Sequence, residues 1–182
     1  MASAFAVALV ALQFGLTTAN DATCILDDIQ VQDNFDLKKY LGKWYEIYWI
    51  LPFDINDPFT DYNHVYEEVN STHFVSHITG RSYEGKCFYN DVHFEIIGNS
   101  KFIKIEDSDK PFWVLKTDYD NYSATYGCDE KFENGTCNKA RGWIWSRNKS
   151  MSLEHFNQAK NALESACIPT SELLKTKQTN RE

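Results

Sequence analysis

Residues Leu41–Ile50 read Leu-Gly-Lys-Trp-Tyr-Glu-Ile-Tyr-Trp-Ile, a stretch in which aromatic and β-branched residues dominate. Such residues favour a pleated, half-buried backbone, so the stretch predicts a strand from Gly42 to Leu51 that is buried on at least one face. Gly42 permits a sharp bend of the backbone into this strand. Trp44, near the strand's start, either closes the end of a hollow structure or begins an ordinary core.

Seven further apolar-rich runs follow, and clusters of Gly, Asn, Asp and Ser separate them. The predicted strands are 62–69, 73–79, 86–97, 101–106, 112–117, 122–128 and 140–146. Pro52 ends the first strand, and residues 53–60 contain Pro58 and several acidic or amide residues. This composition predicts a long loop over 53–60. Eight strands with mostly short connections predict an antiparallel meander, either a closed barrel or a sandwich.

Period-2 alternation is clearest in the middle of the chain. Val92 and Phe94 alternate with His93, and Ile103 and Ile105 alternate with polar neighbours in the same way. One buried face per strand fits a sheet that curls around its own interior.

The spacing changes to a helical period between Ser152 and Cys167. Apolar residues recur there at intervals of three and four, with Ser150 or Ser152 available as the N-cap and Pro169 just beyond the end. This amphipathic helix is predicted to pack against the outside of the sheet.

The first nineteen residues carry no charge, and Ala4–Leu16 is almost wholly apolar. This length is typical of a secretory signal peptide with cleavage near Ala19, although no Lys or Arg precedes the apolar run; an uncleaved anchor is the alternative. We therefore expect a secreted, extracellular protein with no membrane span. Its predicted organisation is a signal peptide over 1–19, one barrel domain over 20–174 and a polar, solvated tail over 175–182.

Composition narrows the function classes. The chain has 182 residues, with 18 Lys and Arg against 26 Asp and Glu, and its net charge of −8 argues against a nucleic-acid partner. Its five cysteines all lie beyond the leader, where disulfides persist, and their odd number leaves at least one outside an intramolecular pair. No Cys-x-x-Cys occurs and the His residues are dispersed, so we expect neither a metal nor a cofactor. Asn-x-Ser/Thr sequons predict glycosylation at two or three of the positions Asn70, Asn121, Asn134 and Asn148.

Three stretches in order carry a family resemblance. They are Gly42-Lys43-Trp44-Tyr45 preceded by Asn34-Phe35-Asp36, then Thr117–Tyr122, then Trp143-Ile144-Trp145-Ser146-Arg147. Together they resemble the lipocalin family, in its kernel form, over Cys24 to about Leu174. Within the family, the chain is most similar to the branch of retinol-binding, apolipoprotein D-type and invertebrate pigment-carrying lipocalins. The resemblance implies an all-β fold: an eight-stranded antiparallel up-and-down barrel, or calyx, with one C-terminal α-helix packed outside.

The resemblance also implies structural pairs. Cys24 pairs with Cys167 and Cys128 with Cys137 by this analogy. Trp44 closes the base of the barrel, and Arg147 stacks over it; guanidinium–indole contacts favour such an arrangement. Both residues are therefore interpreted as structural. Cys87 matches a family cysteine whose usual partner near the C-terminus has no counterpart here, so it is an unpaired thiol, an intermolecular bridge or a bilin attachment point.

Alternation and resemblance together nominate the residues that line the ligand site. They are Ile47, Trp49, Phe74, Ile78, Val92, Phe94, Ile103, Leu115, Thr125, Arg141 and Trp143. Arg141 is a candidate partner for a ligand carboxylate, and the alternative is an exposed arginine at a strand end. His77 is a second polar candidate, although surface positions are the default for the His residues. Rings near the mouth suit a flat ligand by stacking: Trp49, Phe53, Phe59 and Tyr62.

The leading prediction is a secreted, non-enzymatic carrier of a small hydrophobic ligand such as a retinoid, bilin, carotenoid or lipid. One alternative is a lipocalin-type isomerase, which would need the Cys87 thiol inside the barrel because no catalytic triad, paired carboxylates or metal spacing is present. Another is a subunit of a pigment complex, or a homodimer linked through Cys87.

Overall fold

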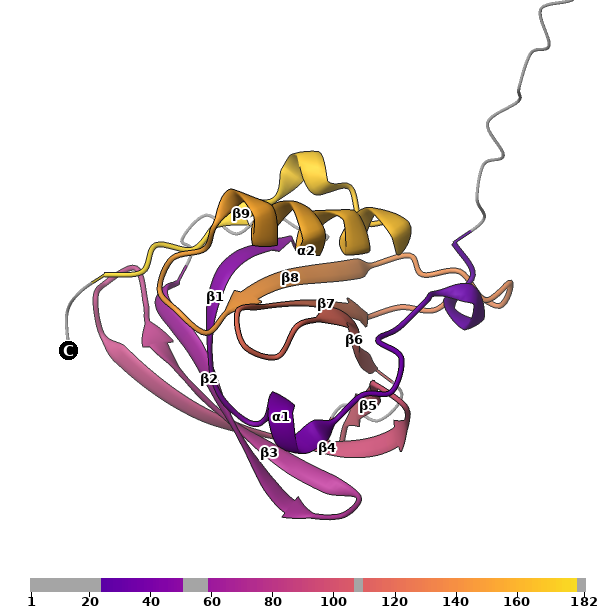
Figure 1. The fold of residues 1–182 in the computed structure, drawn as a ribbon, viewed down its shortest axis with the longest axis horizontal. Coiled ribbons are helices and arrows are strands. Elements are labelled where there is room, and N and C mark those ends of the chain that lie inside the picture. The colour runs from indigo at the N-terminus through magenta and orange to yellow at the C-terminus, as the bar shows by residue number, and fades with distance from the viewer. Residues whose placement is uncertain (1–23, 51–58, 107–109, 180–182) are drawn as a thin grey trace, which may run out of the picture.

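In the computed structural model, residues 24–50, 59–106 and 110–179 are described. Eight antiparallel strands form one closed sheet, in the order β2-β3-β4-β5-β6-β7-β8-β1 with β1 paired back to β2 (Figure 1). The strands are β1 Gly42–Ile50, β2 Thr60–Asn70, β3 His73–Arg81, β4 Cys87–Gly98, β5 Lys101–Lys104, β6 Pro111–Thr117, β7 Tyr122–Cys128 and β8 Ala140–Ser146. The predicted all-β, up-and-down barrel is confirmed, and the sandwich alternative is wrong.

The predicted C-terminal helix is also confirmed. Helix α2 (Leu153–Ser165) begins after Ser152, whose side chain accepts a hydrogen bond from the His155 N–H, so Ser152 rather than Ser150 is the N-cap. Ala159 and Leu163 on its inner face are fully buried. The helix lies against the outside of β7 and β8 (Figure 1). The arm that precedes β1 contains two short helices, η1 (Leu26–Asp28) and α1 (Leu37–Tyr40).

Alternation along the strands separates two cores. The first fills the barrel and is built mainly from aromatic rings: Tyr40, Trp44, Tyr66, Phe74, Phe94, Phe102, Phe112 and Trp145. The second lies between the outer surface of the barrel and α2, and includes Trp113, Leu115, Ile144 and Leu163. A residue's place in the alternation therefore decides whether it faces the lumen or the helix.

The C-terminal tail differs from its prediction as a solvated segment. After helix η2 (Thr170–Glu172), strand β9 (Leu174–Lys175) pairs with Tyr48 and Trp49 of β1. Beyond it, the Thr176 N–H donates to the Ile47 carbonyl, and the Lys177 carbonyl accepts from the Asp61 N–H of β2. The tail therefore fills the seam between the upper halves of β1 and β2, because β1 pairs directly with β2 only through Gly42–Tyr45.

Several predictions fall on residues outside those described. They are the signal peptide over 1–19, the end of the first strand at Leu51, and most of the loop 53–60 with Phe53.

Candidate functional site

The lower end of the barrel is closed by Trp44 and Arg147. The Arg147 guanidinium lies 3.8 Å from the centroid of the buried Trp44 ring. It also donates to the carbonyls of Lys39, Tyr40, Leu41, Lys43 and Tyr119, at 2.8–3.2 Å. A planar guanidinium with five donors suits this task, because one rigid group satisfies carbonyls from two stretches of chain, residues 39–43 and the turn at Tyr119. The structure places both residues in this floor.

Local backbone chemistry positions the floor. Gly42 adopts φ +86°, a conformation that side chains disfavour, and this bend brings the Leu41 and Lys43 carbonyls to Arg147. On the opposite side, the Asp118 carboxylate accepts from the backbone N–H groups of Asn121 and Tyr122. These bonds hold the turn before β7 and help to explain why Asp118 keeps a pKa below its usual range although its partial burial acts to raise it.

Above the floor lies a cavity of about 150 Å³. Its walls combine apolar and aromatic side chains with four charged ones, Lys104, Lys110, Asp129 and Arg141. The lining residues are Tyr62, His64, Ile78, Val92, Phe94, Lys104, Lys110, Pro111, Phe112, Gly127, Cys128, Asp129, Arg141, Trp143 and Trp145. Deeper in the barrel, the rings of Phe74 and Phe94 stack at 4.9 Å and fill the space between the cavity and the floor.

Five of the eleven predicted lining residues lie at this cavity: Ile78, Val92, Phe94, Arg141 and Trp143. Phe74 belongs to the same inner core beneath them. Trp49 is buried opposite Trp143 in the strand register, and therefore shares its inward face. Thr125 is opposite the same Trp143, but its hydroxyl accepts a hydrogen bond from Trp145 at 2.8 Å. Trp49 and Thr125 do not line the cavity.

The prediction that Ile103 and Leu115 line the lumen is wrong. On β5, Phe102 is in the inner core and Lys104 lines the cavity, so Ile103 faces outward into a cleft beside Trp113. Leu115 follows the inward-facing Val114 and belongs to the core beneath α2. On both strands, the residues predicted to face the lumen face outward, and their neighbours face inward. An apolar side chain on the outer face is tolerated there because the N-terminal arm covers Ile103 and helix α2 covers Leu115.

Ile47 is also wrongly predicted. The register of β1 against β8 shifts between Glu46 and Tyr48, so Ile47 is the extra residue of a bulge. Its side chain lines an outer groove with Tyr48 and Phe156. Glu46, opposite the inward-facing Trp145, is buried as well, at 6% exposure, and accepts a hydrogen bond from the Thr176 hydroxyl at 2.5 Å. Burial raises the pKa of Glu46 to about 8, against the smaller opposing effect of that hydrogen bond.

The two polar candidates have partners of their own. Arg141 lines the cavity, but its guanidinium forms an ion pair with Asp129 on the neighbouring strand connection. His77 lies near the surface, with its Nδ1 2.7 Å from Asp91 and 2.8 Å from the Tyr89 hydroxyl. The hydrogen bond and charge of Asp91 raise the pKa of His77.

The sequence did not predict that three side chains of β2 with polar atoms, Tyr62, His64 and Tyr66, face the lumen. It predicts Tyr62 only as a ring near the mouth. His64 and Tyr62 line the cavity, and Tyr66 lies in the inner core below. Their i, i+2, i+4 spacing in Tyr62-Asn63-His64-Val65-Tyr66 was the available signal. Because each residue carries a polar atom, the pattern does not stand out as hydrophobic alternation.

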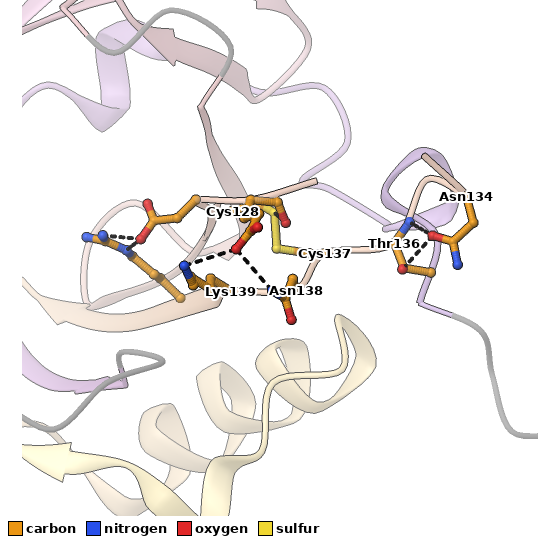
Figure 2. Close-up of a disulfide and its surroundings, with 9 residues drawn as sticks. Cys128, Asn134, Thr136, Cys137, Asn138 and Lys139 are labelled. Carbon is orange, nitrogen blue, oxygen red and sulfur yellow. Dashed lines mark hydrogen bonds and ion pairs between the residues drawn. A yellow bond between two sulfur atoms is a disulfide. The ribbon is translucent and has the colours of Figure 1, made fainter. Parts of the chain in front are cut away.

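Four of the five cysteines form the two expected disulfides, Cys24–Cys167 and Cys128–Cys137. Cys87 is a free, exposed thiol at the start of β4. Figure 2 shows the Cys128–Cys137 bond at the base of the β7–β8 loop and Asn134 near its far end. The Asn134 side-chain oxygen accepts from the N–H and hydroxyl of Thr136 at 3.0 and 2.7 Å, and Asn70 and Thr72 repeat this arrangement.

The fold and the site together define a class: a small barrel that is closed at one end by Trp44 and Arg147 and holds a cavity with aromatic, apolar and charged walls. The Lipocalin / cytosolic fatty-acid binding protein family matches residues 41–180 of the chain, and the chain belongs to this family. Members of the family bind small hydrophobic ligands inside the barrel.

Related sequences agree with this assignment. Apolipoprotein D of Cavia porcellus is 30% identical over 155 residues, which cover 82% of this chain and 80% of that protein. Retinol-binding protein 4 of Gallus gallus is 28% identical over 160 residues, 78% of this chain and 79% of that protein.

Solved structures share the fold. Insecticyanin of Manduca sexta superposes with a TM-score of 0.67 at 22% identity, over 84% of this chain and 86% of that one. Lobster apocrustacyanin A1 superposes with a TM-score of 0.63 at 20% identity, over 79% of each chain. Within the described ranges, none of the helices has the length and apolar character needed to cross a bilayer.

Proposed function

We propose that this protein is a secreted carrier that holds one small hydrophobic molecule in the barrel and performs no chemistry on it. The observation that carries the proposal is the cavity of about 150 Å³ above a sealed floor, lined by Ile78, Val92, Phe112 and Trp143. Such a site gains affinity by removing apolar ligand surface from water, at about 25 cal/mol per Å² before the costs of binding are subtracted.

The size of the cavity narrows the ligand range. A cavity of about this volume accommodates a single ring, as an engineered cavity that binds benzene illustrates. The retinoid, carotenoid, bilin and lipid classes remain the proposed ligands, with a ring-sized end in the cavity and the remainder toward the mouth. Tyr62, Phe59 and Phe88 contact one another at 4.9–6.1 Å between centroids and provide stacking surface beside that cavity.

The isomerase alternative loses support because its only candidate nucleophile is elsewhere. Cys87 is exposed on β4, and its Sγ accepts a hydrogen bond from the Arg81 guanidinium on the outer face of the sheet. The lumen residues described here do not include a free thiol.

Secretion is supported by the uncharged leader and by the two disulfides, which persist in oxidising compartments. We expect N-glycans at Asn134 and Asn70, where the Thr hydroxyl of the sequon reaches the Asn side chain in an exposed turn. Asn121 is the expected exception: its Nδ2 donates to Asp118 at 2.8 Å, and the Ser123 of its sequon is fully buried. Site-resolved mass spectrometry after enzymatic deglycosylation tests this assignment, and occupancy at Asn121 alone would contradict it.

The carrier proposal is tested by blocking the cavity. Val92→Phe fills the lumen, and Val69→Phe adds the same volume on an exposed face of β2. Titration with retinol, followed by quenching of tryptophan fluorescence, should show at least tenfold weaker binding for Val92→Phe and unchanged binding for Val69→Phe. Equal affinity for both variants, or a polar metabolite as the sole compound extracted from the native protein, would overturn the proposal.

A further inference from the structure

His64 is a polar side chain placed deep in the barrel. It lies on the inner face of β2, is 6% exposed and is one of the cavity-lining residues. The Trp145 ring lies 4.6 Å from it, and the rings of Tyr62 and Tyr66 lie at 5.4 and 5.5 Å. These rings hold the imidazole in place and shield it from solvent.

The two ring nitrogens of His64 have different surroundings. Nδ1 is 2.8 Å from the hydroxyl of the fully buried Ser76 on β3. Nε2, at the tip of the ring, has no hydrogen-bond partner among the residues described, and the hydroxyl of Tyr66 likewise has none. Since buried polar groups in folded proteins are almost always paired, two such atoms on rings whose centroids are 5.5 Å apart indicate a place where a bound molecule supplies the missing partner.

The chemistry of that partner follows from the charge of His64. Burial, with a smaller effect of Lys104, lowers the pKa of His64 to about 3, so the imidazole is neutral at physiological pH. A neutral imidazole has one donor and one acceptor nitrogen. With the Ser76 hydroxyl donating to Nδ1, Nε2 carries the ring proton and donates a single hydrogen bond without charge; in the other tautomer it accepts one from a hydroxyl. This arrangement suits a hydroxyl or carbonyl oxygen, because a neutral imidazole offers a carboxylate no opposite charge; the cations that line the same cavity are Lys104, Lys110 and Arg141.

We propose that His64 is the specificity-determining residue of the lumen, and that its Nε2 hydrogen-bonds a neutral hydroxyl or carbonyl oxygen on the buried, ring-sized end of an otherwise apolar ligand. The inference rests on the proposed carrier function. The Tyr66 hydroxyl is the second polar atom available to the same oxygen, and Trp145 forms the flat wall beside it. The ligand therefore enters with its neutral polar end first.

The test uses four ring-sized probes that differ in one functional group: ethylbenzene, 1-phenylethanol, acetophenone and benzoate. Their dissociation constants are measured by tryptophan fluorescence with the wild-type chain, with His64→Leu, and with Val65→Leu on the opposite face of β2 as the matched control. The decisive quantity is the ratio of the ethylbenzene and acetophenone constants within one variant, because this ratio does not depend on that variant's stability. We expect the preference for acetophenone to fall about tenfold in His64→Leu and to stay unchanged in Val65→Leu.

A second readout observes the nitrogen directly. In ¹⁵N-labelled protein, the Nε2 resonance of His64 should shift when 1-phenylethanol or acetophenone is added, and it should stay in place with ethylbenzene. An unchanged ratio in His64→Leu, a stationary Nε2 resonance, or a preference for benzoate that depends on His64 would overturn the inference while leaving the carrier proposal intact. If neither these probes nor retinol binds the wild-type chain, both proposals fail.

Discussion

The two halves of strand β1 are closed in different ways. The lower half, Gly42–Tyr45, pairs directly with β2, and Arg147 covers its end with a permanent charge and five hydrogen bonds to carbonyls. The upper half separates from β2, and the C-terminal tail fills the seam with Thr176 and Gln178. The Gln178 Nε2 alone bridges the carbonyls of Glu46 on β1 and Tyr62 on β2.

This difference separates a permanent closure from one that depends on pH. Arg147 remains protonated under all ordinary conditions, so its bonds in the floor should not respond to pH, and the Asp118 carboxylate, whose pKa lies below its usual range, responds only in acid. Glu46, in the seam, has a pKa of about 8 and loses its proton near the upper end of the physiological range. Above the acidic range, the seam and not the floor is therefore where stability should respond to pH.

The largest expected effect comes from the floor. Arg147→Ala removes the guanidinium above Trp44 and leaves five carbonyls without their donor, so the free energy of unfolding should fall by about 3–5 kcal/mol. Urea denaturation measures the change. Arg147→Lys keeps the charge but loses the planar fork, and should show an intermediate loss. A loss below about 1 kcal/mol for Arg147→Ala would contradict the assignment of the floor to this residue.

The next effect concerns Glu46 and has a defined sign. The folded chain keeps the proton up to about pH 8, whereas the unfolded chain releases it near the ordinary pKa of 4.5. The unfolded state therefore binds fewer protons between these values, and stability falls as the pH rises from 4.5 to 8. Glu46→Gln should remove this slope, and at pH 9 it should be more stable than the wild type by roughly 3 kcal/mol.

Urea midpoints at pH 5 and pH 9 measure that effect. Glu68→Gln, on an exposed part of β2, makes the same change in net charge and is the matched control. If both variants respond equally, the slope comes from overall charge and not from the seam.

A smaller effect is expected at the hydroxyl that contacts Glu46. Thr176→Val keeps the shape of the side chain but removes the donor at 2.5 Å, so a buried carboxyl oxygen loses its partner and stability should fall by about 1–2 kcal/mol. Thr176→Ser retains the hydroxyl and should lose less. Amide hydrogen exchange should show faster exchange in the upper half of β1 for Thr176→Val, with the floor unchanged; uniform acceleration would indicate that the two halves are not separable.

The smallest effect is expected at Cys87, which belongs to neither half of β1. Because its thiol is exposed and outside both disulfides, Cys87→Ser should change stability by less than about 0.5 kcal/mol. Size-exclusion chromatography with and without reductant then shows whether the thiol links two copies. A dimer that persists in Cys87→Ser would assign association to another surface.

The sequence predicted the strands and the helix to within a few residues, because aromatic and β-branched runs between turn residues leave few other ways to satisfy the backbone. It predicted the lining residues less well. On β5, Ile103 and Lys104 both fit a strand, and only the packing of the arm and Trp113 on the outer face decides that Ile103 points away from the lumen. On β1, a single bulge exchanges the expected facing of Ile47 and Glu46.

The local sequence therefore determined the strands and the helix, whereas the resemblance of three motifs to the lipocalin family predicted the closed barrel and its floor, because the strand pattern alone fits either a barrel or a sandwich. Tertiary structure decided the facing of individual side chains, because a shift of one residue moves a side chain to the other side of the sheet. It also placed the polar tail in the seam. Thr176 and Gln178 look solvated in sequence, and they are held there only because β1 and β2 separate above Tyr45 and leave backbone groups that the tail satisfies.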